Sequence, residues 1–207
     1  MRVRWSPIPV CADLAVVAVL LTISYCFAPP GTAPTDRPDN ASTRAEVVAL
    51  IHSLIVAEPT GAAPYDRGQF PHWIEITSGC DTRCTVLDRQ RSPGGWWSAY
   101  DGYVARTSSE LEIDHVVPLA EAWRSGAAAW TVARRQAFAN DLLGAELLAV
   151  SAWSNRDKGA GDPSTWRPPD PTWWCNYAAA WAGVKVRWSL AADPAEIESL
   201  LDLADRC

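Results

Sequence analysis

Apolar residues recur at helical spacing near both ends of the chain. Residues 42–58 have this spacing behind a Ser-Thr start, and Pro59 closes the segment. The stretch from Trp173 to Trp188 has the same pattern over a greater length. Residues 193–196 read Asp-Pro-Ala-Glu, a sequence typical of the first turn of a helix. These patterns predict a helix after residue 42 and two helices at the C-terminal end.

The middle of the chain alternates between strand-like and helix-like patterns. The elements predicted there are, in order, a strand at 111–117, helices at 119–124 and 131–138, a strand at 147–150, and a short helix between Ser151 and Gly159. Residues 60–110 are rich in turn residues and aromatics, so we expect mostly loops there. The order of elements predicts an α+β fold, mostly helical, around a small ββα unit at about residues 111–159.

The N-terminal segment has the layout of an export signal. Arg2 and Arg4 precede an apolar run of about fifteen residues, shorter than the roughly twenty that a spanning helix needs. Lipidation at Cys26 is disfavoured because the bulky Tyr25 precedes it. The predicted organisation is a signal peptide, favoured over an N-terminal anchor, at 1–28, a flexible linker at 29–41, and one domain at 42–207. The protein is therefore expected to be secreted, or held at the outer face of the cytoplasmic membrane through this segment alone.

Charge and composition restrict the class of function. With 207 residues, 48% of them hydrophobic, the chain can bury a core. The formal net charge of −6 argues against a protein that coats nucleic acid. It does not argue against a nuclease, because a local basic track and a metal ion suffice to neutralise phosphate.

Four of the six cysteines lie in the predicted domain: Cys80, Cys84, Cys175 and Cys207. An even number of cysteines in an exported domain predicts disulfides. Three pairings are possible, and we expect Cys80 with Cys84 and Cys175 with Cys207. The alternative, a structural zinc site, fits poorly because Cys-x3-Cys and a lone terminal cysteine do not match zinc-ribbon spacing.

Two short motifs carry candidate chemistry. Asp114 and His115 are adjacent on a predicted strand, so both can face one site only at a strand end or bulge, and Pro118 makes an end plausible. Asn155 and Lys158 are three residues apart on a predicted helix and share a face. Taken separately, the Asp-His pair is as typical of a buried hydrogen-bonded pair as of a functional site, and Asn155 with Lys158 is more typical of an ordinary polar helix end. Their order along the ββα unit makes a functional site the better interpretation.

These motifs resemble a known family. Over about residues 64–207 the chain is similar to HNH-type endonucleases that share the C-terminal domain of GmrSD restriction enzymes, in particular exported actinobacterial members. The matching segments are 65–67, 80–83, 100–102, 112–123, 138–141, 148–150, 154–159 and 166–169, with Cys175, Tyr177, 184–185 and Trp188.

The resemblance implies a metal-dependent endonuclease that hydrolyses phosphodiester bonds. In this mapping His115 is the general base, and Asp114 and Asn155 are metal ligands whose oxygens suit Mg²⁺ or Mn²⁺. Lys158 is the candidate for binding phosphate and Arg156 a weaker one. The expected partner is nucleic acid, with DNA ahead of RNA, although no base-reading element is visible. Oligomeric state is not indicated.

One position departs from the family pattern. The middle asparagine of the His-Asn-His motif usually braces the loop that bears the histidine, but Glu146 occupies its place, and Asn140 is a candidate substitute in the catalytic set. A catalytically weak or inactive exported envelope protein is therefore an alternative.

A further alternative comes from the twelve tryptophans, which are many for this length. A cell-wall or carbohydrate-binding module would stack sugars on exposed indoles, with Trp96, Trp97, Trp173 and Trp174 as candidates.

Overall fold

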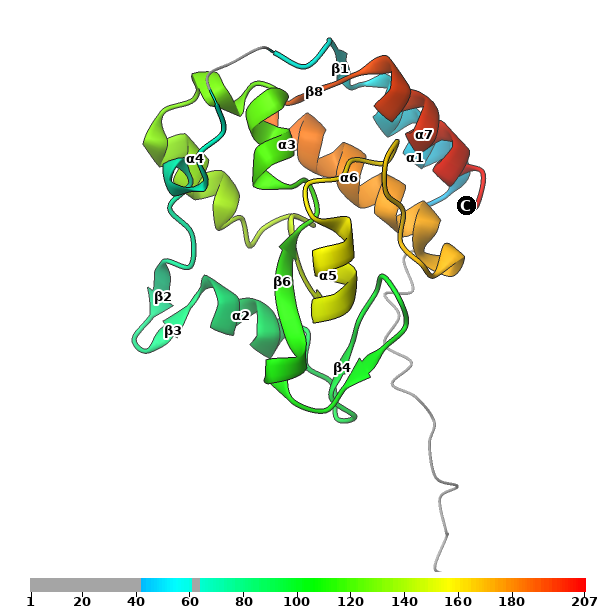
Figure 1. Cartoon of the computed structure of the whole chain (residues 1–207). Coiled ribbons are helices and arrows are strands. Elements are labelled where there is room, and N and C mark those ends of the chain that lie inside the picture. The colour runs from blue at the N-terminus through cyan, green and yellow to red at the C-terminus, as the bar shows by residue number, and fades with distance from the viewer. Residues whose placement is uncertain (1–41, 61–63) are drawn as a thin grey trace, which may run out of the picture. The chain divides into compact units, whose positions relative to one another are not determined.

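The computed structural model describes residues 42–60 and 64–207 (Figure 1). Its helices are α1 (Arg44–His52), α2 (Thr82–Arg89), α3 (Leu119–Arg124), α4 (Val132–Ala139), α5 (Ala152–Lys158), α6 (Trp174–Trp188) and α7 (Pro194–Ala204). Its strands are β1 (Ile55–Val56), β2 (Glu75–Thr77), β3 (Cys80–Asp81), β4 (Trp96–Trp97), β5 (Val104–Ala105), β6 (Leu111–His115), β7 (Leu147–Ser151) and β8 (Ala191–Ala192). The predicted α+β class is confirmed. The predicted leader at 1–28 and linker at 29–41 lie outside the described residues.

Side-chain caps begin the helices near the predicted positions. Thr43 and Glu46 form a reciprocal capping box at the start of α1. The side chains of Ser151 and Asp193 accept from the backbone amides of the third residues of α5 and α7, Ser154 and Glu196. The prediction for α1 was too long, because the helix ends at His52 and the next apolar residues form β1, which pairs in parallel with β8.

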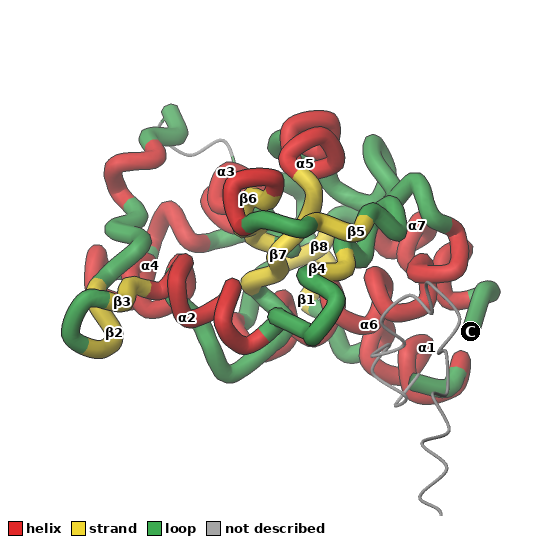
Figure 2. The backbone as a smooth tube through the Cα atoms, turned by 90° about the horizontal axis from the view of Figure 1, so that it is seen from below, coloured by secondary structure: helices red, strands yellow, loops and turns green. Residues whose placement is uncertain are grey.

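The predicted ββα unit is present. β6 and β7 pair antiparallel, with Leu111 opposite Ser151 and His115 opposite Leu147. Figure 2 shows α5 on one side of this two-stranded ribbon and α2 on the other. The helix α2 lies in the segment expected to be loops and was not predicted, because Val86 and Leu87 are its only buried apolar residues.

Two apolar clusters hold the unit in place. The larger is built on α6, which packs against α1 and α7, and it includes the fully buried Tyr177 and Trp181. The smaller lies between the ribbon and α2, with Ile113 and Val86 among its members. Each apolar side chain fully removed from water contributes about 1.5–3 kcal/mol to folding. The ribbon is therefore fixed from both sides.

Lys185 ties α3, α6 and α7 together from inside the larger core. Its side chain is fully buried and its Nζ lies 2.9 Å from a carboxylate oxygen of Glu121 and 2.6 Å from one of Glu196. Burial raises the pKa of Glu196 to about 7. The two carboxyls satisfy an ammonium that would be very costly to bury alone.

The tryptophans proposed for sugar stacking are not an exposed platform. Trp96 and Trp173 are each 7% exposed, and Trp97 and Trp174 are partly buried. Apolar packing in the two cores explains their number. Trp153 on α5, not one of the candidates, is 63% exposed.

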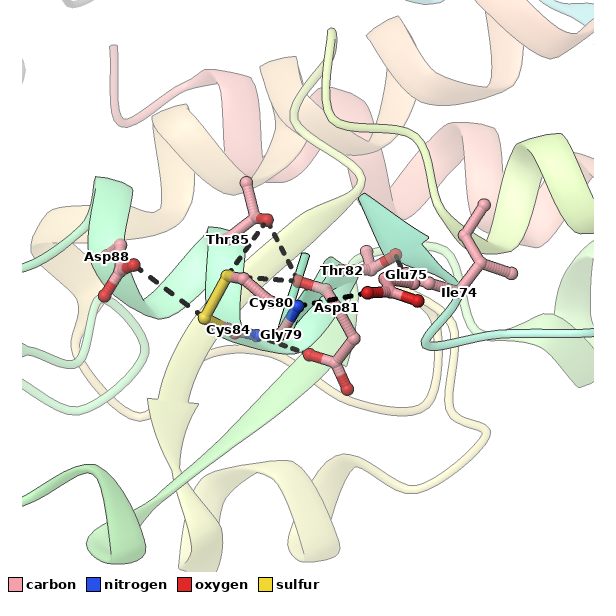
Figure 3. Close-up of a disulfide and its surroundings, with 9 residues drawn as sticks. All are labelled: Ile74, Glu75, Gly79, Cys80, Asp81, Thr82, Cys84, Thr85 and Asp88. Atoms are coloured by element: carbon pink, nitrogen blue, oxygen red, sulfur yellow. Dashed lines mark hydrogen bonds between the residues drawn. A yellow bond between two sulfur atoms is a disulfide. The ribbon is translucent and has the colours of Figure 1, made fainter. Parts of the chain in front are cut away.

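Both predicted disulfides are present. Cys80–Cys84 joins β3 to the first turn of α2 (Figure 3), and Cys175–Cys207 joins α6 to the end of the chain. Asp88 lies close to Cys80 and Cys84, but both sulfurs are used in the disulfide, which leaves no thiolate pair for a metal. Within the described ranges, no helix has the length and apolar character needed to cross a membrane.

Candidate functional site

A pocket of about 290 Å³ lies at the end of β6. It is lined by Tyr65, Arg67, Ile113, Asp114, His115, Pro118, Leu119, Ala120, Asn155, Gly159 and Ala160. Asp114 and His115 are the last two residues of the strand, and both reach this pocket although they are consecutive. The expectation that a strand end would bring them to one site is therefore met, and Asn155 joins them from α5.

His115 is held as a neutral imidazole. Its ring is 5% exposed and packs against Trp73, with 5.7 Å between ring centroids. Burial lowers its pKa to about 3. Its Nε2 lies 3.0 Å from the carbonyl oxygen of Ala139, and because a carbonyl can only accept, Nε2 carries the proton. Nδ1 is then the nitrogen with a free lone pair.

Asp114 is 5% exposed and strongly engaged. It accepts a 2.6 Å hydrogen bond from the Tyr100 hydroxyl and two from Lys158 Nζ, at 3.0 and 2.8 Å. Burial raises the pKa of Asp114, and the neighbouring ammonium of Lys158 opposes that rise. The carboxylate is thus fixed in orientation before any ligand arrives.

Lys158 lies beneath the pocket and is not one of its lining residues. Its side chain is fully buried, and besides Asp114 its Nζ donates to the main-chain oxygen of His115 at 2.8 Å. These three hydrogen bonds use all the protons of the ammonium. The structure therefore places Lys158 as a brace for the strand end and not where the expected phosphate would contact it.

Asn155 and Arg156 share one partner, Glu112. Asn155 Nδ2 donates to Glu112 Oε2 at 2.7 Å, so its Oδ1 is the amide atom left for a ligand. Arg156 donates twice to Glu112 Oε1, at 2.9 and 2.6 Å, and its side chain is 75% exposed. Although partial burial acts to raise the pKa of Glu112, the hydrogen bonds from these two residues lower it. An ionised Glu112 thereby orients the Asn155 amide.

Glu146, at the place of the missing middle asparagine, is hydrogen-bonded to the backbone after His115. It is fully buried, its main-chain oxygen accepts from Val116 N at 2.7 Å, and its Oε2 accepts from Val117 N at 3.2 Å. Burial raises its pKa well above the ordinary range, and Oε1 has no hydrogen-bond partner among the described residues. Glu146 therefore does not face solvent; its burial favours the neutral carboxyl, and it braces the loop after His115.

Asn140 is buried behind the histidine and does not line the pocket. Its Nδ2 donates to the carbonyl oxygens of Pro71 and Gln136, at 2.9 and 2.7 Å. Its Oδ1 accepts from the amide of Ile74 and the hydroxyl of Thr82, at 3.2 and 2.7 Å. Asn140 thus joins the 71–74 loop to the end of α4, directly after the residue that holds His115.

Arg67 and Tyr65 line the pocket and were absent from the predicted site. Within the part of the chain that the structure describes, no carboxylate forms an ion pair with Arg67, unlike Arg156. The available signal was the Tyr-Asp-Arg segment at 65–67, one of the segments that carry the family resemblance. Asp66 caps the short 3-10 helix Arg67–Gln69 by accepting from Gly68 N at 2.9 Å, which sets the backbone that presents Arg67.

Comparison with known proteins identifies a family and a relative of this chain. The family described as GmrSD restriction endonucleases, C-terminal domain, matches residues 95–203, a span that contains β6, β7 and α5. A protein of Arthroderma benhamiae described as an uncharacterized secreted protein is 38% identical over 202 residues, covering 92% of this chain and 98% of its own length. No solved structure matches the chain. The chain belongs to the nuclease-related family of GmrSD restriction endonuclease C-terminal domains.

Proposed function

We propose that this protein is an exported, metal-dependent endonuclease that hydrolyses phosphodiester bonds with His115 as the general base. The observation that carries the proposal is the convergence of His115, Asp114 and Asn155 on one pocket, with the tautomer of the histidine set by Ala139. Because burial lowers the pKa of His115, its imidazole is neutral at neutral pH, which is the protonation state that a general base needs. The family supports nuclease chemistry in general, and the roles of single residues are our assignment.

The residues around the pocket fit a hard divalent ion. Asp114 and Asn155 contribute oxygen ligands from two different elements, the donor type that Mg²⁺ and Mn²⁺ prefer. The Asp114 carboxylate has about four lone-pair sites. Two on Oδ2 and one on Oδ1 accept from Tyr100 and Lys158, which leaves a lone pair of Oδ1 for an ion. When bound, such an ion supplies positive charge next to the scissile phosphate. Lys158 keeps the ligand oxygens in place, and Glu112 does the same for the Asn155 amide.

Arg67 is our candidate for holding the phosphate. It reaches the pocket from the segment before β2, its guanidinium can bind two phosphate oxygens, and no described carboxylate competes for it. Arg156 follows Asn155 on α5 and offers a second cation if its pair with Glu112 opens. In the reaction, water loses a proton to His115 Nδ1 as its oxygen bonds to phosphorus. The bond from phosphorus to the leaving sugar oxygen then breaks, and that oxygen takes a proton from solvent.

Export of the protein is supported by the two disulfides and by the secreted relative. DNA remains the preferred substrate in the proposal, and a cleaved leader is preferred to an anchor. The pocket engages the phosphodiester backbone, which both nucleic acids share.

The test is cleavage of supercoiled plasmid and of an RNA of equal length by the oxidised protein, with Mg²⁺, with Mn²⁺ and with EDTA. We expect nicking that requires metal and falls at least about 100-fold in His115→Ala. The matched control is His52→Ala, because His52 is exposed on α1. Arg67→Met should raise KM and lower kcat while Arg44→Met, an exposed arginine of α1, changes neither. A folded wild-type protein as inert as His115→Ala would overturn the proposal.

A further inference from the structure

The two contacts that hold the His115 ring come from different segments. The carbonyl of Ala139 at the end of α4 accepts from Nε2, and Trp73 of the 71–74 loop packs against the ring. Trp73 has a φ of 59°, in the left-handed region that costs a non-glycine residue about 1–2 kcal/mol. Such a backbone persists only where its surroundings fix it. The position of the His115 ring therefore depends on the contacts that connect the end of α4 to the 71–74 loop.

The side chain of Asn140 connects these two segments, and Thr82 in turn donates a hydrogen bond to Asn140. The four hydrogen bonds of the Asn140 side chain join the 71–74 loop to α4. The shortest bond to its Oδ1, at 2.7 Å, comes from the Thr82 hydroxyl, whose residue is fully buried. The Thr82 amide also donates to the carbonyl of Ile74 at 2.9 Å. Thr82 thus bonds both to Asn140 and to the 71–74 loop that Asn140 holds.

Thr82 lies inside the loop that the Cys80–Cys84 disulfide closes (Figure 3). It is the first residue of α2, an eight-residue helix of the length that is marginal alone in water. The β2 strand next to it is exposed at all three residues, so little apolar packing fixes this corner. The remaining ties are polar: the Asp81 side chain accepts from Cys84 N at 2.8 Å, and Arg83 donates to the main-chain oxygens of Ser108 and Leu111.

We propose that Thr82 is a positioning residue for His115, acting through Asn140, and that the Cys80–Cys84 disulfide makes this positioning conditional on oxidation. The inference rests on the proposed nuclease function. In the reduced chain the first turn of α2 loses its covalent link to β3, so the Thr82 hydroxyl is no longer fixed against Asn140. The ring of His115 is then no longer held in one tautomer. A nuclease of this kind is weak until it leaves the reducing cell interior.

The Cys80–Cys84 disulfide forms and breaks by exchange with an external dithiol–disulfide couple. Oxidation of Cys80 and Cys84 forms one S–S bond and releases two protons and two electrons, which a disulfide oxidant of the export compartment takes up as it becomes a dithiol. Reduction reverses these transfers.

The experiment compares the double variant Cys80→Ser/Cys84→Ser with Cys175→Ser/Cys207→Ser in the full chain. The first should lower kcat for plasmid nicking at least about tenfold with KM changed less than about twofold. The second removes a disulfide remote from the pocket residues and should leave kcat within about twofold at a temperature where it is folded. Thr82→Val should lower kcat as the first does, and Thr82→Ser, which keeps the hydroxyl, should restore it.

A readout that needs no activity separates this proposal from the proposed function. The chain has three histidines, so ¹⁵N-histidine spectra can be assigned with His52→Ala and His72→Ala variants. We expect a slowly exchanging Nε2–H of His115 in the wild type and in Thr82→Ser, and its loss in Thr82→Val and in Cys80→Ser/Cys84→Ser. Loss of this signal in a protein that cleaves nothing would support the switch and contradict the nuclease. Wild-type kcat and an unchanged signal in the disulfide variant would overturn the switch.

Discussion

The Nζ of Lys158 donates hydrogen bonds to both carboxylate oxygens of Asp114, at 3.0 and 2.8 Å, with both side chains buried. From its place on a helix, Lys158 was predicted to contact phosphate. In the structure it is instead the buried counter-ion of Asp114, a candidate metal ligand. Removal of one partner from such a pair leaves an unpaired charge in the interior.

We expect Lys158→Met to lower the free energy of unfolding by about 3–5 kcal/mol, because Asp114 stays buried with Tyr100 as its remaining partner. Urea titration at neutral pH measures the change. Arg156→Met is the matched control, since its ion pair is exposed and such pairs contribute at most about 1 kcal/mol. A Lys158→Met protein as stable as wild type but weak in DNA binding would restore the phosphate role.

Glu146→Gln should change the pH dependence of stability. The folded-state pKa of Glu146 is raised above 4.5, so its contribution is fully present below about pH 4.5 and is lost as pH rises towards the folded pKa. The neutral amide keeps an acceptor for Val117 N and does not titrate. Relative to wild type, the variant should therefore gain stability between pH 5 and pH 8, as thermal unfolding at both values would show. A pH-independent difference would mean that Glu146 is ionised in the folded protein.

Glu112→Ala should weaken metal binding without touching a ligand. The Asn155 amide loses the acceptor of its Nδ2 and is free to rotate, and loss of such orienting partners typically costs about 10–100-fold in metal affinity. Calorimetric titration with Mn²⁺ measures it. Glu110→Ala is the control, since Glu110 is exposed at the other end of β6 and bonds to Tyr103 and Thr107. Equal Mn²⁺ affinity in Glu112→Ala and wild type would argue against Asn155 as a ligand.

The two disulfides should differ in what their removal does. Loss of Cys175–Cys207, which spans 32 residues, should cost about 4 kcal/mol of stability, and loss of Cys80–Cys84, which spans 4, about 2 kcal/mol. Guanidinium unfolding of the two serine double variants tests the order. The variant with the smaller stability loss is expected to have the larger loss of kcat, which separates a structural disulfide from one that positions the site.

Local pattern was sufficient for much of the fold. The strands at 111–117 and 147–150, the cap at Ser151 and the helices of the C-terminal part are set by side-chain periodicity and by residues a few positions away, so the sequence alone predicted them. The expected pairing of the cysteines, one of three that the sequence allowed, is also confirmed. The helix α2 was not predicted, because a helix with two buried apolar residues has no periodic signal and forms only where the ribbon covers it.

The sequence by itself brought Asp114, His115 and Asn155 forward as candidates, and all three line the pocket, but it did not indicate Tyr65 or Arg67. Only the tertiary structure decided what each neighbour does. Whether Lys158 faces solvent or Asp114 depends on the depth at which α5 packs on β6, and the environment of Glu146 depends on the loop it meets. Both outcomes depend on burial and on contacts between segments that are far apart in the chain, and local periodicity does not encode such contacts.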